Sequence, residues 1–214
     1  MIDVKLTASP TEFQMRCRSV RLRLDVAFHC RSSIAYCDVR LTRSIVLIGF
    51  MGTGKSSVGR VLEKEMGCRR FDTDEMVSSQ FNMSIQEIFS THGEDKFREA
   101  ETQALQSLNG KTPAIIVTGG GVVTKAKNID LLKKLGTVVW LDAEHATLRA
   151  RMNRLKDRPL LQTPDPAASF SELLHTRNPL YRSTADIRVD ISEKTPEEIA
   201  TLIARSIQNC PAGD

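Results

Sequence analysis

Eight consecutive residues, Gly49 to Ser56, combine the groups with which proteins hold a polyphosphate. The segment reads GFMGTGKS and fits the pattern G-x-x-x-x-G-K-[ST] at every fixed position. Glycines let backbone N–H groups approach phosphate oxygens, because no Cβ stands in the way. Lys55 can reach the β and γ phosphates, and the Ser56 hydroxyl can take a place on Mg²⁺. A plain glycine turn is the alternative, but the apolar run before the segment and the helical pattern after it favour a nucleotide-binding loop.

Two aspartates, Asp72 and Asp74, end the next strand-like segment, which reads FDTD. In an extended chain, residues two apart project on the same side, so both carboxylates are expected to face one site. One carboxylate could support Mg²⁺ through water, while its neighbour holds a substrate hydroxyl. A polar turn whose aspartates cap a helix is an equally open interpretation.

Two arginines, Arg98 and Arg177, are candidates for binding a carboxylate. Arg98 lies in GEDKFREAE, where Glu101 follows three residues later and could hold the guanidinium in place. Arg177 begins the segment RNPLY, and an arginine can bind a carboxylate through two parallel hydrogen bonds. A solvated charged face is the alternative for Arg98, since exposed pairs contribute little. An ordinary surface position is the alternative for Arg177.

Three consecutive glycines, Gly119, Gly120 and Gly121, follow an apolar run. Ligands of parallel α/β sheets bind at the carboxyl ends of the strands. We therefore interpret these glycines as a close approach of the backbone to a ligand, since a loose turn needs only one glycine.

Four arginines punctuate the segment LRARMNRLKDRPLL: Arg149, Arg151, Arg154 and Arg158. The last three could share one helix face, and Pro159 ends the run. An arginine placed over a transferring phosphate stabilises the transition state. A basic helix surface is the alternative and is expected to account for one or two of the four.

The elements that position these groups alternate between short apolar runs and longer helical patterns. Strands are expected at Ile45–Ile48, Cys68–Phe71, Ala114–Val117, Thr137–Leu141 and Ile187–Val189. Helices are expected at Ser57–Met66, Ile85–Leu108 with a break near Gly93, Lys127–Leu135, Ala143–Leu155, Phe170–Tyr181 and Pro196–Ile207. Loops are expected at Asn109–Pro113 and Gln162–Ser169. This alternation predicts βαβ units and a three-layer α/β/α sandwich.

Composition limits the class of protein. The 214 residues fit one domain, or one domain plus an appendage. Residues 1–43 hold eight Lys/Arg and four Asp/Glu, which accounts for the whole net charge of +4, so the rest of the chain has no net attraction to nucleic acid or anionic lipid. The five cysteines form no CxxC pair, which indicates a reduced intracellular protein without disulfides or a zinc site. The apolar runs are shorter than the ~20 residues of a membrane helix.

Residues 1–43 are expected to form a poorly ordered N-terminal extension before a domain at residues 44–214. They contain no apolar core of a secretory signal. Their arginines allow an organelle transit peptide, but four acidic residues argue against one. We therefore expect a cytoplasmic location, with an organelle as the alternative. Nucleic-acid binding through this arginine-rich segment is a weaker possibility.

Taken in order and at these intervals, GFMGTGKS, FDTD, FRE, TGGG, RPLL and RNPLY resemble the shikimate kinase family from about Ser44 to Ile207. The resemblance implies a five-stranded parallel sheet of the nucleoside-monophosphate-kinase type. It implies transfer of the γ-phosphoryl group of ATP to the 3-hydroxyl of shikimate, in chorismate and aromatic amino acid biosynthesis. ATP and shikimate are the implied partners, Mg²⁺ the cofactor, and a monomer without nucleic-acid or membrane partners the expected state. The first 43 residues depart from the family pattern.

The resemblance also assigns roles to residues. The implied ATP-binding residues are Gly52, Thr53, Gly54, Lys55, Ser56, Ser57, Arg151, Arg158, Lys194 and Pro196. The implied shikimate-binding residues are Asp74, Arg98, Gly119, Gly120, Gly121 and Arg177. Ser56 and Asp72 would serve the metal. Lys55, Asp74 and Arg158 would be catalytic, with Arg158 on a lid at about residues 154–168, and a role of Asp74 as base stays open.

Two other functions remain open at this point. A small-molecule kinase of similar build, such as a gluconate kinase, is the nearest, because two arginines indicate a carboxylate substrate without specifying shikimate. A non-catalytic nucleotide-binding module is the second, although such a module would be expected to lose Lys55 or the aspartates.

Overall fold

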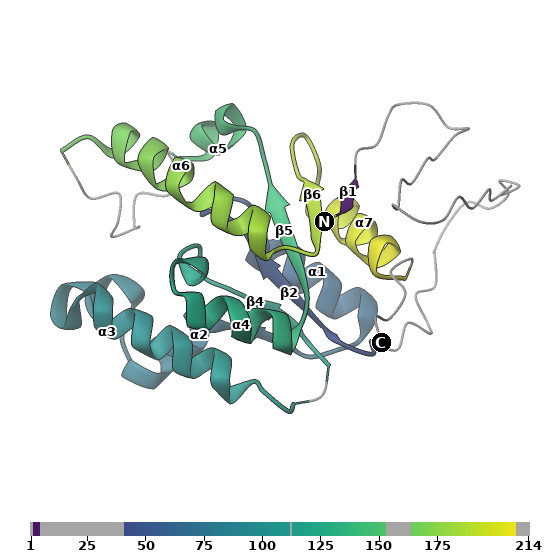
Figure 1. Ribbon diagram of the computed structural model, residues 1–214, viewed down its shortest axis with the longest axis horizontal. Coiled ribbons are helices and arrows are strands. Elements are labelled where there is room, and N and C mark those ends of the chain that lie inside the picture. The colour runs from purple at the N-terminus through teal and green to yellow at the C-terminus, as the bar shows by residue number, and fades with distance from the viewer. Residues whose placement is uncertain (1, 5–40, 112, 153–163, 209–214) are drawn as a thin grey trace, which may run out of the picture.

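The computed structural model describes residues 2–4, 41–111, 113–152 and 164–208. Within them, six parallel strands form one sheet in the order β1-β6-β5-β2-β4-β3 (Figure 1). The strands are β1 (Ile2–Val4), β2 (Ser44–Ile48), β3 (Arg70–Asp72), β4 (Ile115–Val117), β5 (Gly136–Asp142) and β6 (Ile187–Asp190). The helices are α1 (Lys55–Met66), α2 (Thr73–Phe81), α3 (Ile85–Ser107), α4 (Ala126–Leu135), α5 (His145–Met152), α6 (Pro166–Thr184) and α7 (Pro196–Gln208), with a short 3-10 helix η1 (Val122–Thr124).

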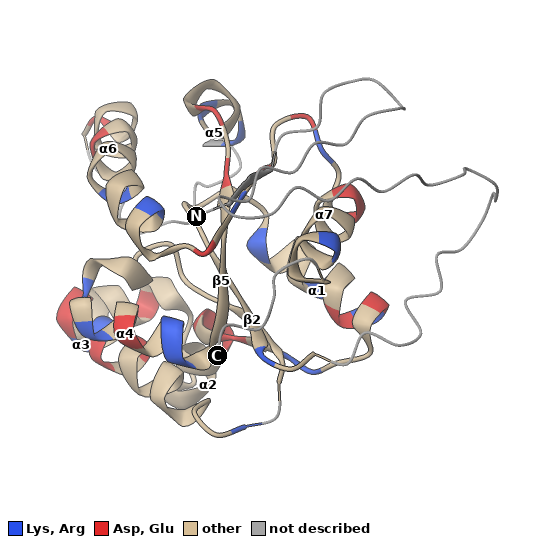
Figure 2. Cartoon of the chain, turned by 45° about the vertical axis from the view of Figure 1, so that its right-hand side comes forward, with Lys and Arg blue, Asp and Glu red and all other residues tan. Residues whose placement is uncertain are grey.

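Strand β2 lies in the interior of the sheet, between β5 and β4, and both of its faces are buried. Val46 and Ile48 belong to the apolar core on one face, and Ile45 and Leu47 belong to the core on the other. Successive strand residues point to opposite faces, so an uninterrupted apolar run predicts this double burial. Helices α1 and α7 cover one face, and α4 and α6 cover the other, as Figure 2 shows with the sheet between them. The expected three-layer α/β/α sandwich is confirmed.

The five expected strands are all present. The sixth, β1, was not expected, and pairs in parallel with β6. Strand β1 is the part of residues 1–40 that the structure describes. That the rest of this N-terminal extension is poorly ordered stays a prediction.

Two expectations about local structure are wrong. Helix α2, which starts at Thr73, was not predicted, so the chain at Asp74 is helical and not extended. Helix α6 starts at Pro166, within the loop expected at Gln162–Ser169, because the Asp165 side chain accepts the Ala167 and Ala168 N–H groups at 3.1 and 3.0 Å. The residues of the expected lid from Pro166 onward therefore belong to a helix.

The break predicted in the long helix is confirmed. Gly93 has φ 80° inside α3 and separates an N-terminal segment from a C-terminal segment. A reciprocal capping box between Ser84 and Glu87 starts the first segment. Among the described helices, none combines the length and the hydrophobicity of a membrane-spanning segment.

Candidate active site

The glycine-rich loop between β2 and α1 holds its lysine inside the loop. Lys55 is 8% exposed, and its Nζ donates to the carbonyl oxygens of Gly49 and Phe50 at 2.8 and 2.9 Å. Gly52 and Gly54 both have φ 81°, a conformation that favours glycine. The loop and the N-terminal, positive end of α1 line one cavity.

That cavity measures about 470 Å³, within the usual range for a small-molecule site. Of the ten residues predicted to bind ATP, nine line it: Gly52, Thr53, Gly54, Lys55, Ser56, Ser57, Arg151, Lys194 and Pro196. Arg151 on α5 donates to the carbonyl of Gly52 at 3.2 Å, which ties α5 to the loop. The tenth, Arg158, lies outside the described residues, as do Arg154 and most of the predicted lid. Arg149 is exposed, which agrees with the alternative that some of the four arginines belong to a basic helix surface.

Ser56 and Asp72 form a pair of hard oxygen donors at the edge of this cavity. The Ser56 hydroxyl donates to Asp72 Oδ2 at 3.1 Å, and Asp72 is 5% exposed. Mg²⁺ in phosphate-binding sites uses one or two protein oxygens and keeps waters and phosphate oxygens as its other ligands. The two residues therefore fit the magnesium ion expected from the sequence.

Asp72 and Asp74 reach the site by a route that differs from the predicted one. Asp72 is the N-cap of α2, and its Oδ1 accepts the backbone N–H of Asp74 at 3.1 Å. Asp74 lies in the first turn of the helix. The helix-capping and ligand-binding interpretations are thus compatible, because a capping aspartate keeps its second oxygen for the cavity.

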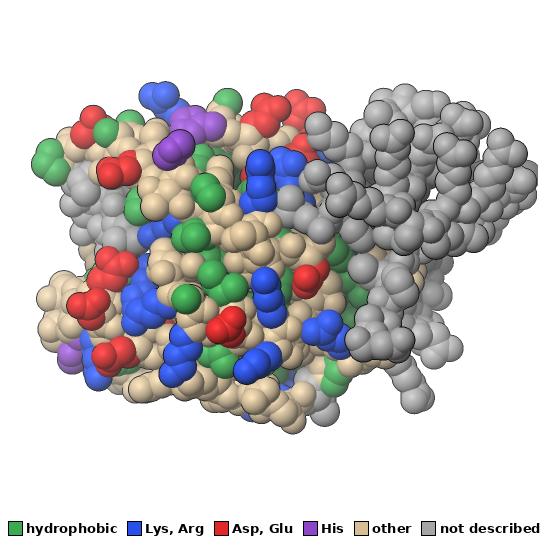
Figure 3. All heavy atoms as spheres, in the orientation of Figure 1, with side chains coloured by type: hydrophobic (Ala, Val, Ile, Leu, Met, Phe, Trp, Pro, Cys, Tyr) green, Lys and Arg blue, Asp and Glu red, His purple; other side chains and the backbone are tan. Residues whose placement is uncertain are grey.

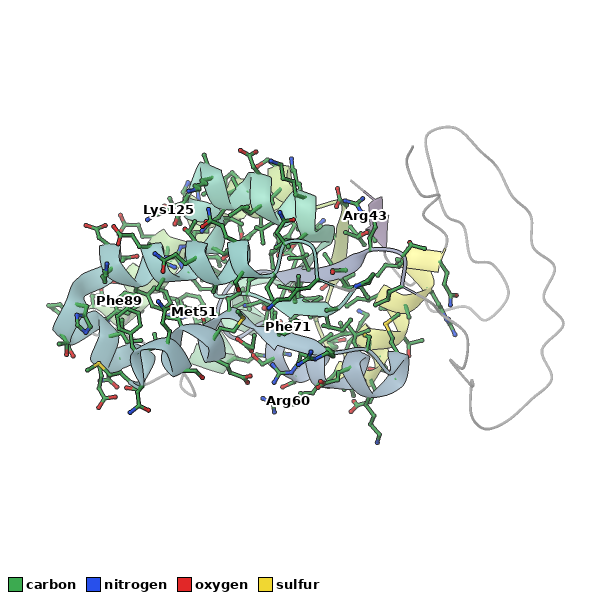
Figure 4. All side chains as sticks on the ribbon, turned by 90° about the horizontal axis from the view of Figure 1, so that it is seen from below. Arg43, Met51, Arg60, Phe71, Phe89 and Lys125 are labelled. Atoms are coloured by element: carbon green, nitrogen blue, oxygen red, sulfur yellow. The ribbon has the colours of Figure 1, made fainter. Side chains whose placement is uncertain are left out.

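A smaller cavity of about 50 Å³ adjoins the first, since Met51, Asp74 and Gly120 line both. It brings together all six residues predicted to bind the second substrate: Asp74, Arg98, Gly119, Gly120, Gly121 and Arg177. Its apolar wall consists of Met51, Ile85, Phe89 and Phe97, of which Met51 and Phe89 are labelled in Figure 4.

Arg98 is held by two carboxylates. It is 5% exposed, its Nη1 donates to Glu101 Oε2 at 2.9 Å, and its Nη2 donates to Glu94 Oε1 at 3.0 Å. Burial lowers the pKa of Arg98, but Glu101 and Glu94 outweigh burial and leave it raised. Burial raises the pKa of the fully buried Glu101, against the opposing effect of Arg98. The solvated-face alternative for Arg98 is therefore wrong.

Arg177 faces the same cavity from α6. It is 4% exposed, donates to the carbonyl of Gly120 at 3.4 Å, and lies over the Phe50 ring at 6.0 Å. The Tyr181 hydroxyl donates to the same carbonyl. Burial lowers the pKa of Arg177, and the charge of Arg98 acts in the same direction. Two buried guanidinium groups beside one cavity favour an anionic ligand, which would relieve their repulsion.

A side chain at position 119 or 121 would force neighbouring charged groups to move. A Cβ at Gly119 would lie 2.7 Å from both Asp74 Oδ1 and Glu101 Oε1, and a Cβ at Gly121 would lie 2.5 Å from Arg98 Cζ. The glycine loop is therefore packed directly against the charged side chains of the smaller cavity.

Gly121→Ala is expected to lower kcat/KM for the carboxylate substrate by roughly 10²-fold, because the new methyl group displaces the Arg98 guanidinium by about an ångström. Steady-state kinetics measure kcat/KM, and a urea denaturation curve separately measures the stability of the fold. Gly67→Ala, at a site with no heavy atom within 4 Å of the added Cβ, is the control. It should cost stability through its φ of 61° but leave kcat/KM unchanged. A Gly121→Ala enzyme with wild-type kcat/KM would contradict the prediction.

Some residues of the site were not assigned roles from the sequence. Glu94 stands four residues before Arg98, a spacing that signals an ion pair on a helix. Tyr181 lies within RNPLY, but nothing local indicates that its hydroxyl reaches Gly120. The apolar wall comes from elements that only the fold brings together.

Comparison with known proteins gives consistent matches. A family model described as shikimate kinase matches residues 51–208. The shikimate kinase of Thermodesulfovibrio yellowstonii is 40% identical over 171 residues, which cover 80% of this chain and 98% of that protein. That of Caldanaerobacter subterraneus is 41% identical over 164 residues, covering 77% and 95%.

Solved structures agree with this match. The shikimate kinase from Acinetobacter baumannii in complex with shikimate superposes with a TM-score of 0.76 at 34% identity, covering 80% of this chain and 96% of that one. The Aquifex aeolicus shikimate kinase gives a TM-score of 0.70 at 36% identity, covering 80% and 99%.

Proposed function

The chain belongs to the shikimate kinase family of small-molecule kinases, and from that premise we propose that it transfers the γ-phosphoryl group of ATP to the 3-hydroxyl of shikimate. The products are shikimate 3-phosphate and ADP, within aromatic biosynthesis. The observation that carries the proposal is the pair of adjoining cavities, which puts a phosphate-binding loop beside two buried arginines and a carboxylate. Membership of this family also argues against a gluconate kinase.

In the larger cavity, the loop amides and Lys55 bind the β and γ phosphates of ATP. The carbonyl oxygens of Gly49 and Phe50 keep Lys55 oriented until ATP arrives. Lys55 then exchanges these two partners for phosphate oxygens. Ser56 and Asp72 would hold Mg²⁺, which neutralises developing phosphate charge. We propose that Arg151, Lys194 and Pro196 lie beside the nucleotide, and that Arg158 closes over its phosphates.

In the smaller cavity, Arg98 and Arg177 bind the carboxylate of shikimate, and the backbone at Gly119–Gly121 approaches its ring. Asp74 accepts a hydrogen bond from the reacting hydroxyl and aims it at the γ phosphate. Because the transition state of phosphoryl transfer is loose, alignment matters more than early removal of the proton. We therefore propose that Asp74 mainly orients the reacting hydroxyl, and only secondarily acts as a base.

We further propose that residues 44–214 form the catalytic domain, that the enzyme is a monomer, and that it works in the cytoplasm, with an organelle as the alternative if residues 1–43 act as a transit peptide. Nucleic acid and membranes are not expected as partners. Acidic and basic side chains are interspersed on the face drawn in Figure 3, which supports this expectation.

The test is ADP formation by the full chain with Mg²⁺ and ATP, in the presence and absence of shikimate, with the product examined by ³¹P NMR. A shikimate-dependent rate and a phosphate on the 3-oxygen are expected. Gluconate in place of shikimate should give no ADP. Binding of shikimate without ADP formation would instead indicate a non-catalytic module and overturn the proposal.

A further inference from the structure

Arg70 is a cation inserted among carboxylates at the predicted magnesium site. Its Nη1 lies 3.3 Å from Asp72 Oδ2, its Nη2 lies 3.0 Å from Glu75 Oε2, and its Nε lies 3.6 Å from Glu63 Oε2. Arg70 and Asp72 are two apart on strand β3, so their side chains share one face of that strand. None of the roles assigned above uses Arg70.

Two contacts other than Arg70 orient the Asp72 carboxylate. Its Oδ1 is fixed by the backbone N–H of Asp74 at 3.1 Å, and its Oδ2 is fixed by the Ser56 hydroxyl at 3.1 Å. Arg70 contacts the same Oδ2 that faces Ser56. What Arg70 adds is therefore mainly charge, placed on the carboxylate oxygen that would face the metal.

Arg70 itself is held firmly in place. Its side chain is 14% exposed, and its stem packs against α1, where a Cβ added at Gly59 would lie 3.4 Å from Arg70 Cδ. Figure 4 shows this region, with Phe71 marking β3 and Arg60 marking α1. A guanidinium keeps its charge at all working pH values, so its influence on Asp72 is permanent.

We propose that Arg70 weakens the attraction of the Ser56–Asp72 site for Mg²⁺, so that the metal–nucleotide product can leave after each turnover. The proposal rests on the proposed kinase function. With Arg70 present, its charge offsets one of three nearby carboxylates, and without it all three act on the metal. Product release limits the rate of many well-evolved enzymes, so a site that binds its metal too tightly would slow turnover.

The test measures metal affinity directly, without shikimate and without turnover. Mn²⁺ replaces Mg²⁺ in the ADP complex, and electron paramagnetic resonance counts the free ion. Arg70→Leu is expected to bind Mn²⁺ about threefold to tenfold more tightly than the wild type, given the short charge separation and partial burial. Arg70→Lys keeps the charge and should stay near the wild-type affinity.

Arg69→Leu is the matched control, because it removes the same charge from the preceding residue. Arg69 is exposed and lies over the Phe71 ring at 5.4 Å. Its loss should leave Mn²⁺ affinity unchanged. Equal shifts in the two leucine variants, or weaker binding by Arg70→Leu, would overturn the proposal.

A second variant covers the case in which Arg70→Leu does not fold. Arg70→Gln removes the charge but keeps a polar group that can donate to Asp72. Tighter Mn²⁺ binding is expected for this variant also, and unchanged or weaker binding would count against the proposal. Failure of the kinase function would appear separately, as wild-type enzyme that binds Mn²⁺ and ADP but forms no ADP from ATP and shikimate.

Discussion

Lys55→Met is expected to lower kcat roughly 10³-fold while leaving the affinity for shikimate unchanged. Methionine keeps most of the apolar stem but removes the ammonium, which is the positive charge buried within the phosphate loop. Phosphoryl transfer depends on fixed charges around the phosphates, so the loss should appear in the chemical step. Coupled ADP release gives kcat, and calorimetry with shikimate gives the dissociation constant.

Lys64→Met is the control, because Lys64 is an exposed lysine on the same helix. It should retain wild-type kcat. A Lys55→Met enzyme that turns over within tenfold of the wild type would show that the loop amides and the metal suffice without the ammonium.

Arg98→Met is expected to destabilise the fold by about 3–5 kcal/mol and to abolish measurable shikimate binding. The fully buried Glu101 loses its nearest cation, at 2.9 Å from Oε2, and an uncompensated buried charge remains. Adding Glu101→Gln should restore most of the stability without restoring shikimate binding. Urea denaturation and calorimetry separate the two effects, and a double variant that recovers both would contradict the prediction.

The same variant should be sensitive to pH. Burial raises the pKa of Glu101, and Arg98→Met removes the main opposing charge. A group whose pKa is raised in the folded state stabilises below its unfolded pKa and loses that contribution as pH rises through the folded pKa. The stability deficit of Arg98→Met should therefore be smaller near pH 5 than near pH 8. Glu101→Gln should remove this difference, and an equal deficit at both pH values would refute the assignment.

Much of the fold could be predicted from local patterns. The apolar runs at β2 and β5 and the helical spacing between strands are signals contained in short windows, so they predict the α/β/α sandwich. Helix α2 escaped prediction because Asp72 serves both as the last strand residue and as a helix cap, with no loop between. Helix α6 begins early because Asp165 supplies a cap inside a proline-containing segment that resembles a loop.

Many of the residues that line the two cavities could be predicted from the sequence, but the electrostatics between them could not. Asp74, Arg98 and Arg177 lie in recognisable motifs, and the structure brings them to one cavity. Whether Arg98 is exposed on its helix or buried beside a ligand cavity depends on how α3 packs against the rest of the fold. The contact between Tyr181 and Gly120 spans 61 positions in the chain, and no short pattern encodes it.

Gly93, the left-handed glycine inside α3, divides one wall of the smaller cavity between two helical segments. Ile85 and Phe89 lie before Gly93, whereas Phe97 and Arg98 lie after it. The rings of Phe89 and Phe97 meet across this glycine with their centroids 4.8 Å apart, so the helix changes direction without separating its apolar side chains. A single residue in the left-handed region thus lets one helix supply both the apolar wall and the charged side of the same cavity.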